Sequence, residues 1–392
     1  MSDSLDIPSL LQPRVRDLPP SGIRKFFDLV NEMKDAISLS VGEPDFVTPW
    51  RVREAGIYSL EQGHTHYSPN AGFIRLRRSI ADYLKRFDVD YDPKTEIIVT
   101  VGGSEAIDLA LRALAGPGDE VIVPEPSFVA YKACAFLTGA TAVPLPLEEK
   151  DQFKLTPEKL LSVLTPRSKV LIFPFPSNPT GAVMTREEIA KIVDIVRERN
   201  LIVLSDEIYA ELSYHGPHVS IASFPGMRDR TVLVSGFSKA YAMTGWRLGY
   251  AAAHPDMIAA MNKIHQYCIM SSPTTAQYAG IEALDNCDEE VREMTREYNR
   301  RRKVMVKGFR EAGLECFEPM GAFYTFPSVK STGMTSAEFC EKLLLEEKVA
   351  VVPGEAFGDC GNGFIRACYA YSVDSINTAM ERVKNFVARH RR

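Results

Sequence analysis

Residues 169–208 read KVLIFPFPSNPTGAVMTREEIAKIVDIVRERNLIVLSDEI, and the order of apolar and polar residues in this stretch predicts the architecture. Two uninterrupted apolar runs, Lys169–Phe173 and Leu201–Leu204, stand at either end. Such runs are typical of strands that are buried on both faces of a mainly parallel sheet. Between them, Thr185 and Glu188 form a capping box, and the apolar residues that follow recur with helical spacing. The stretch is therefore predicted to be a strand–helix–strand unit.

The same alternation continues on both sides of this unit. Four further apolar runs are predicted to be strands, namely Ile97–Val101, Glu120–Val123, Thr231–Val234 and Leu248–Ala253. Another helix is predicted to begin at Ser104 and to end at Gly116 and Pro117. Strands that alternate with helices over this length indicate a doubly wound α/β domain.

The alternation of strands and helices does not continue outside this region. Residues 1–20 hold four prolines and are predicted to form an extended arm, after which Ser21 caps a helix. The segment Asp285–Ala312 is dense in charge and free of proline, which indicates a long helix that leads to a C-terminal region. An α+β pattern is predicted there, with short strands at Ala322–Phe326 and Phe364–Tyr369 and helices at Ser336–Glu347 and Val373–Arg389.

Composition excludes several classes of protein. The chain has 392 residues, of which 45% are apolar, so it can bury a large core and form two domains. A net charge of −5 does not suit non-specific nucleic-acid binding. No apolar run approaches the roughly 18 residues of a membrane span, and no secretory signal is visible. The 7 cysteines include no CxxC pair, so we expect neither zinc nor disulfides, and we expect a cytoplasmic protein.

Several polar residues follow directly after predicted strands. The turn Gly102–Ser104 leads into a helix whose free amides could hold a phosphate, although a simple small-residue turn explains it as well. Asp206 ends a buried strand and should need a cationic partner, which a structural salt bridge would also provide. Lys239 follows another buried strand, where desolvation lowers its pKa and makes its amine available for a Schiff base. Asn178 lies in a tight loop, from which its amide would reach the same sheet edge.

Residues 236–249, GFSKAYAMTGWRLG, resemble the lysine signature of the class I/II aminotransferases, which are fold-type I transferases that use pyridoxal 5'-phosphate (PLP). Four more motifs match in the family's order, namely Gly42–Phe46, Asn178–Gly181, Asp206–Tyr209 and Phe364–Ala367. The resemblance extends from about Ser21 to Val387, which is nearly the whole chain. The sequence looks most like a bacterial subgroup that acts on aromatic amino acids, alanine or N-acyl-diaminopimelate.

This resemblance implies an α/β fold with two domains and a homodimeric assembly. The large PLP-binding domain would comprise residues 46–291, with a mainly parallel sheet of the seven-stranded type flanked by helices. A small α+β domain would comprise residues 21–45 and 292–392, and residues 1–20 would form the arm. Tyr67 matches the family tyrosine that reaches the phosphate of the neighbouring subunit, which implies a homodimer with shared active sites.

The resemblance also implies a role for each matched residue at the cofactor ring. Lys239 would hold PLP covalently as an internal aldimine and, once freed, would move the proton from Cα to C4′. Asp206 would pair with the pyridinium nitrogen. Tyr209 and Asn178 would donate to the phenolic oxygen, and Phe128 would stack on the ring. Lys239, Asp206 and Tyr209 are thus the catalytic candidates.

Around the phosphate, the implied ligands are Gly103, Ser104 and Arg247. Many relatives carry a serine three residues before the lysine, where this chain has Gly236. Either Ser238 or Ser235 compensates, or the phosphate has one ligand fewer.

The substrate α-carboxylate would be bound by Arg366, with help from Asn178 and the Gly42 backbone. Ile23 would offer apolar contact to the substrate side chain. Since no arginine occurs from Asn262 to Cys287, where dicarboxylate-specialised relatives place one, we expect a neutral or amphipathic amino donor.

The predicted activity is PLP-dependent transamination between an L-amino acid and a 2-oxo acid, 2-oxoglutarate by resemblance, through a ping-pong mechanism. Two alternatives share the scaffold, namely a carbon–sulfur β-lyase and a non-catalytic PLP-binding regulator. We expect no nucleic-acid partner and no membrane. We also expect no metal, because the loop histidines are read as structural or solvated: His64, His66, His215 and His218.

Overall fold

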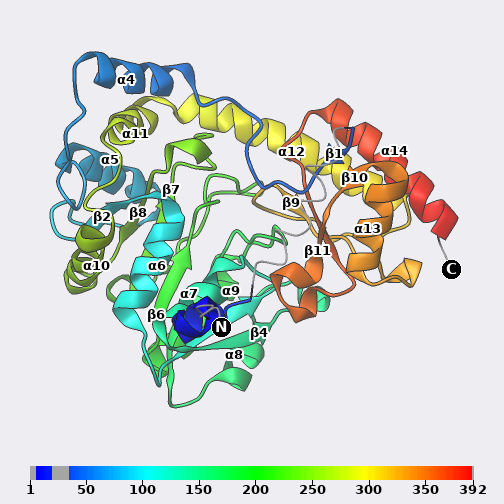
Figure 1. The fold of residues 1–392 in the computed structure, drawn as a ribbon, viewed down its shortest axis with the longest axis horizontal. Coiled ribbons are helices and arrows are strands. Elements are labelled where there is room, and N and C mark those ends of the chain that lie inside the picture. The colour runs from blue at the N-terminus through cyan, green and yellow to red at the C-terminus, as the bar shows by residue number, and fades with distance from the viewer. Residues whose placement is uncertain (1–5, 20–34, 391–392) are drawn as a thin grey trace, which may run out of the picture.

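A seven-stranded sheet forms the centre of the molecule (Figure 1). The computed structural model describes residues 6–19 and 35–390. The strands are β2 (Ile97–Thr100), β3 (Glu120–Glu125), β4 (Thr141–Pro146), β5 (Ser168–Phe173), β6 (Ile202–Asp206), β7 (Thr231–Gly236) and β8 (Gly249–Ala252), in the order β2-β8-β7-β6-β5-β3-β4. Strands β3 to β7 pair in parallel, whereas β8 runs antiparallel to both of its neighbours. The predicted doubly wound, mainly parallel sheet is confirmed.

The edge strand β4 was not among the predicted strands. Most of its residues are exposed or half-buried, and it contains Pro144 and Pro146, so its sequence lacks a continuous apolar run. Proline is tolerated at a sheet edge because an N–H on the solvent side has no ladder partner to lose. Conversely, β6 and β7 continue beyond their apolar runs through Asp206 and Gly236.

Helices cover both faces of the sheet, so successive strand residues enter different cores. Ile98 lies in one core with helices α6 (Gly102–Leu114), α7 (Ala130–Thr138) and α10 (Pro255–Cys268). Ile97 faces the opposite side, where α5 (Ile74–Leu84), α11 (Thr274–Asn286), α8 (Pro157–Val163) and α9 (Arg186–Glu198) cover the sheet and α4 (Trp50–Glu61) packs on α11. Burial on both faces explains the uninterrupted apolar runs. The predicted capping box joins Thr185 and Glu188 at the start of α9.

A second core lies at the C-terminal end of the chain. It is built from α12 (Asp288–Glu311), α13 (Ser336–Glu347), α14 (Val373–His390) and a three-stranded antiparallel sheet of β9 (Tyr324–Thr325), β11 (Val352–Pro353) and β12 (Ile365–Cys368). The long helix α12, yellow in Figure 1, runs across the molecule to α14. Strand β1 (Ile37–Ser38) pairs in parallel with β10 (Val349–Ala350), which attaches the N-terminal segment to this region. The domain bounds 21–45, 46–291 and 292–392 stay a prediction, and α12 continues across the last of them.

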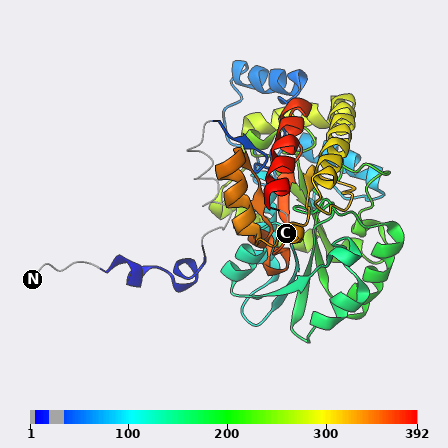
Figure 2. The ribbon, with the colours of Figure 1, turned by 90° about the vertical axis from the view of Figure 1, so that its right-hand side faces the viewer.

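Two predicted elements differ in the structure. The arm is not simply extended, because it contains the one-turn helices α1 (Ile7–Leu10) and α2 (Pro13–Arg16), whose early prolines suit a first helical turn. In Figure 2 this dark-blue arm projects from one side of the molecule, and it touches α7 at Arg14, which donates a 3.3 Å hydrogen bond to the Phe136 carbonyl oxygen. The single helix predicted for Asp285–Ala312 is instead the end of α11 and the whole of α12, separated at Cys287.

The predicted helix at Ser21 and the residue Ile23 lie outside the described residues. Within residues 6–19 and 35–390, no helix has both the length and the apolar character that crossing a membrane requires.

Candidate active site

A cavity of about 430 Å³ lies where the parallel strands end. Open α/β sheets bind ligands at this edge, because loops and helix N-termini converge there. The cavity is lined by almost all of the predicted site residues, which come from distant parts of the sequence: Gly42, Gly103, Ser104, Phe128, Asn178, Asp206, Tyr209, Ser238, Lys239, Arg247 and Arg366. The fold therefore gathers the motifs into one site.

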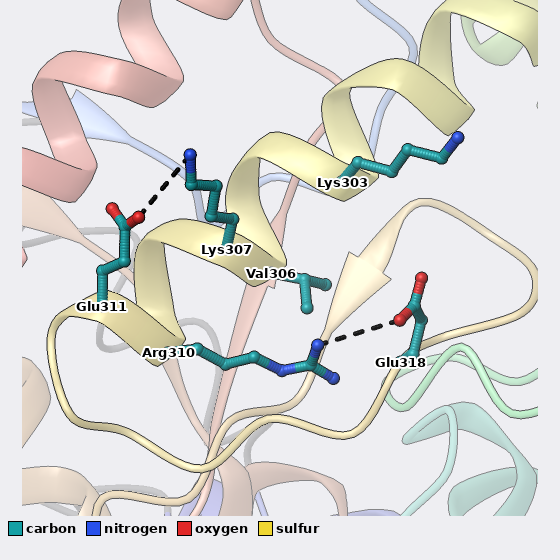
Figure 3. A pocket seen from close by; sticks show the side chains of 6 residues that line it. All are labelled: Lys303, Val306, Lys307, Arg310, Glu311 and Glu318. Carbon is teal, nitrogen blue, oxygen red and sulfur yellow. Dashed lines mark ion pairs between the residues drawn. The ribbon is translucent and has the colours of Figure 1, made fainter.

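Another hollow, of about 360 Å³, lies along α12 and holds none of these residues (Figure 3). Its charged side chains form ion pairs, with 3.6 Å between Lys307 and Glu311 and 3.8 Å between Arg310 and Glu318. These side chains are roughly half exposed or more, and ion pairs of that kind contribute little to stability or chemistry. The cavity at the sheet edge is therefore the candidate active site.

Lys239 follows β7 and points into this cavity. Its Nζ donates a 2.7 Å hydrogen bond to the carbonyl oxygen of Gly42 and lies 5.6 Å from the centre of the Phe323 ring. Burial lowers the pKa of Lys239 to about 8, and the nearby arginines act in the same direction. The neutral amine is thus far more accessible near neutral pH than in an ordinary lysine.

Asp206 is buried at the end of β6. Its Oδ2 accepts a 2.6 Å hydrogen bond from the Tyr131 hydroxyl, and its Oδ1 accepts one of 3.1 Å from the Ile208 amide. Burial raises the pKa of Asp206, and these two donors oppose that effect. Within the described residues Asp206 forms no salt bridge, so the structural alternative for its cationic partner is not seen. The pairing with a pyridinium nitrogen stays a prediction.

Tyr131 lines the cavity and was missed by the sequence analysis. It packs edge-on against Phe128, with 5.6 Å between the ring centres. No motif pointed to it. The one signal that could have linked it to the site is its spacing of three residues from Phe128, which lies in the turn just before α7.

The N-terminus of α6 opens into the cavity without a side-chain cap, so its first amides are available to an anion. Gly102 adopts a φ of +75°, and a Cβ there would lie 2.6 Å from the Arg247 guanidinium. Glycine at this position lets Arg247 approach the helix start. An uncapped helix N-terminus beside a guanidinium is a strong site for phosphate.

The structure shows why the serine that the resemblance implies three residues before the lysine would not fit at Gly236. A Cβ on Gly236 would lie 2.9 Å from the Gly249 backbone, which leaves no room for a larger side chain. Ser235 turns away from the cavity, and its hydroxyl donates to the Glu207 carbonyl oxygen. Ser238 lines the cavity, so it is the better placed of the two serines.

Arg366 is buried in β12 with its guanidinium facing the cavity. It donates to the Asn178 side-chain oxygen at 3.0 Å and to the Ser40 carbonyl oxygen at 2.6 Å. It stacks between the rings of Tyr324 and Phe357, at 4.6 and 4.8 Å from their centres. Its Nε has no hydrogen-bond partner within the described residues. Each terminal nitrogen of Arg366 carries two N–H groups and uses one of them in the hydrogen bonds to Asn178 and Ser40, so the guanidinium that faces the cavity keeps donors for a carboxylate.

The tyrosines Tyr209 and Tyr67 have different environments. Tyr209 is buried beside the cavity, and its hydroxyl oxygen lies 2.9 Å from that of Tyr324, another residue that the sequence analysis missed. Tyr67 is 83% exposed and does not line the cavity of its own chain.

The histidines have structural surroundings where the structure describes their contacts. His218 is buried, and its Nε2 lies 2.8 Å from a carboxylate oxygen of the buried Glu207. His64 stacks on Tyr278, with 4.8 Å between the ring centres. Across residues 6–19 and 35–390, no group of three or more histidine, cysteine or acidic side chains is arranged to hold a metal ion.

Comparison with known proteins gives matches over almost the full length of the chain. A family model described as "Aminotransferase class I and II" matches residues 34–383. The putative aminotransferase YugH of Bacillus subtilis (strain 168) is 52% identical, over 97% of this chain and 98% of that protein. An aspartate aminotransferase of Pyrococcus abyssi (strain GE5 / Orsay) is 44% identical, over 98% and 97%. The crystal structure of an aromatic aminotransferase from Pyrococcus horikoshii OT3 superposes with a TM-score of 0.89 at 42% identity, over 94% of this chain and 99% of that one.

Proposed function

The chain belongs to the class I and II aminotransferases, and we propose that it transfers the amino group of an L-amino acid to 2-oxoglutarate by a ping-pong mechanism. The observation that carries the proposal is the meeting of Lys239, Asp206 and Arg366 in one cavity. A lysine with a lowered pKa can react as a neutral amine, a buried acid can pair with a ring nitrogen, and a buried arginine can bind a substrate carboxylate.

The family depends on PLP, and the residues of the cavity fit this cofactor. PLP carries an aldehyde, a pyridine nitrogen and a phosphate. The amine of Lys239, the carboxylate of Asp206 and the N-terminus of α6 beside Arg247 provide one complementary group for each. When bound, PLP supplies an electron sink for the pair released as the substrate Cα–H bond breaks. We propose that Lys239 is the residue of covalent attachment.

The residues of the chain then have separate tasks. The neutral amine of Lys239 would act as the base that takes the proton from the substrate Cα and delivers it to C4′ of the cofactor. Asp206 would keep its negative charge beside the pyridine nitrogen, and Phe128 would pack against the ring. Tyr209 and Asn178 would donate hydrogen bonds to the phenolic oxygen, which would favour its ionised form.

The phosphate would be held by Gly103, Ser104, Ser238 and Arg247. The helix dipole and the guanidinium both stabilise the negative charge there. Ser238 takes the place of the serine that the crowded Gly236 cannot provide.

The α-carboxylate of the substrate would be bound by Arg366, with Asn178 and the Gly42 backbone beside it. The place of Arg366 in the cavity wall supports this role, because each terminal nitrogen uses one of its two N–H groups in the hydrogen bonds to Asn178 and Ser40 and keeps the other for a charged acceptor. Ile23, which lies outside the described residues, is retained as a proposed contact of the substrate side chain.

The charge around the cavity supports a neutral or amphipathic amino donor. Among the described residues that line it, the cations are Lys239, Arg247 and Arg366, and each already has a task. A second carboxylate would be desolvated without a partner, which is costly. The named relatives act on aspartate in one case and on aromatic amino acids in the other, so both classes of donor need to be measured.

We also propose a cytoplasmic homodimer with shared sites. Large apolar and aromatic side chains are exposed on α4 and at the end of α10, together with Tyr67: Trp50, Ile57, Tyr58, Tyr267, Ile269 and Met270. The hydrogen bond from Asn70 to the Met270 carbonyl oxygen places the Tyr67 loop beside the end of α10. Exposed patches of this kind mark protein interfaces. All seven cysteines are free thiols, which suits a reducing compartment.

The test is a panel of amino donors with 2-oxoglutarate, in which glutamate formation gives kcat/KM for phenylalanine, tyrosine, alanine, methionine and aspartate. We expect a neutral donor to be preferred. A kcat/KM for aspartate at least about tenfold above all others, a difference of about 1.4 kcal/mol, would contradict the donor class. Absence of glutamate with every donor, together with release of pyruvate and ammonia from cystathionine, would contradict transamination itself and favour the β-lyase.

A further inference from the structure

Tyr324 lies where three parts of the candidate site meet. It is buried on β9 and lines the cavity. Its hydroxyl oxygen lies 2.9 Å from the hydroxyl oxygen of Tyr209, and its ring lies 4.6 Å below the Arg366 guanidinium. One side chain thus touches both the proposed cofactor ligand Tyr209 and the proposed carboxylate ligand Arg366.

The position of this hydroxyl is tightly determined by Gly42. A Cβ on Gly42 would lie 2.0 Å from the Tyr324 hydroxyl oxygen, so any other residue there would displace the phenol. The carbonyl oxygen of the same Gly42 accepts the hydrogen bond from Lys239. The hydroxyl therefore fits between Tyr209 and a backbone segment that also holds the lysine.

Counting protons gives the direction of the hydrogen bond between the two phenols. Each phenol has a single proton, so it can donate one hydrogen bond. If Tyr209 donates to the cofactor, its proton is used, and the bond between the tyrosines requires Tyr324 to be the donor. A hydroxyl that accepts one hydrogen bond becomes a stronger donor in the next, because the bonds polarise one another.

Both phenols are protonated at neutral pH, as this arrangement requires. Burial raises the pKa of Tyr324 to about 12, with Arg366 opposing and the Cys368 thiol adding to the rise. Burial likewise raises the pKa of Tyr209 well above its ordinary value, with the neighbouring Tyr324 adding to the rise.

We propose that Tyr324 is a positioning residue, whose hydroxyl donates to Tyr209 and directs the proton of Tyr209 toward the cofactor oxygen, while its ring supports Arg366. This inference rests on the proposed function, since Tyr209 has that task only when PLP is bound. The two contributions of Tyr324 are separable, because Tyr324→Phe removes the hydroxyl and keeps the ring.

The experiment is a pH titration of the cofactor absorbance in four holoenzymes: wild type, Tyr324→Phe, Tyr209→Phe and the double variant. In the wild-type background, Tyr324→Phe is expected to raise the midpoint of the absorbance titration by about half a pH unit or more, because Tyr209 becomes a weaker donor to the cofactor oxygen. In the Tyr209→Phe background, the same change is expected to give no shift, because its effect passes through Tyr209. The KM for the amino donor should stay within about twofold while kcat falls, because the ring still supports Arg366.

Tyr298→Phe is the matched control. Tyr298 is buried on α12 in the same apolar cluster, and its hydroxyl has no hydrogen-bond partner within the described residues. Its removal is expected to leave the midpoint unchanged.

If the wild type shows the cofactor band and forms glutamate, the proposed function stands. Two results would then overturn the inference about Tyr324 by itself. One is the absence of a shift in Tyr324→Phe, and the other is an equal shift in both backgrounds, which would indicate a general structural effect. A wild type that binds no PLP would overturn the inference and the proposed function together.

Discussion

The lowered pKa of Lys239 predicts a measurable reactivity in the protein freed of cofactor. Burial shifts the pKa from the ordinary 10.5 to about 8, which favours the neutral amine. Raising the pH removes the proton, so the neutral amine appears near pH 8 instead of above pH 10. At pH 8, half of the Lys239 amines are neutral, compared with about 0.3% of ordinary lysines, so the neutral fraction is about 150-fold higher.

Competitive acetylation measures this difference. The protein is labelled with limiting acetic anhydride from about pH 6 to about pH 11, and the modified peptides are quantified by mass spectrometry. The exposed Lys303 on α12 is the internal reference. The label on Lys239 is expected to rise with a midpoint near pH 8.

The variant Lys239→Ala serves as the assignment control. It should remove the labelled peptide, the cofactor adduct that borohydride fixes, and nearly all turnover. A midpoint for Lys239 above about pH 10 would refute the reasoning, because it would show that burial does not destabilise the ammonium form. Transamination by Lys239→Ala at a rate comparable to wild type would refute the role of the lysine.

Asp206→Asn is expected to retain PLP while kcat falls by several powers of ten, since each ~1.4 kcal/mol of lost transition-state stabilisation costs tenfold; an unchanged kcat would contradict the role of its charge. Tyr67→Phe is expected to weaken PLP retention by about 1.5–3 kcal/mol, the value of one hydrogen bond to a charged group, and light scattering should show a dimer. A fully active monomer would rule out shared sites. Gly42→Ala is expected to lower the free energy of unfolding by about 1–3 kcal/mol, because the new methyl group meets the Tyr324 hydroxyl at 2.0 Å. A Cβ on Gly116 would have no neighbouring atom within 4 Å, so Gly116→Ala should leave the free energy of unfolding unchanged. Denaturant titration measures both variants, and equal losses of stability would contradict the prediction.

The sheet was predictable because burial on both faces imposes a pattern on consecutive residues. A strand covered on both faces needs apolar side chains at every position, so runs such as Lys169–Phe173 indicate their own environment. The edge strand β4 could not be found in this way, since its exposed positions and prolines do not form an apolar run.

The candidate site was predictable where a motif carries its chemistry in consecutive residues. Lys239 and Asp206 were singled out by their position after apolar runs, and their roles, like that of Arg366, came from the resemblance to family motifs. The choice between Ser235 and Ser238 needed the structure, because it depends on which side of the loop faces the cavity.

The partners of these residues were decided by tertiary structure alone. Tyr131 lies 75 positions from Asp206, and Tyr324 lies 115 positions from Tyr209, yet each pair is in hydrogen-bond contact. Periodicity and capping act over a few residues, so the sequence by itself determined the buried strands of the sheet, some of the helices and the candidates for the site. The contact between Tyr131 and Asp206 depends on how α7 packs against the sheet, and the contact between Tyr324 and Tyr209 depends on how the C-terminal core packs against it. Both packings bring together groups whose separation along the chain leaves no local pattern.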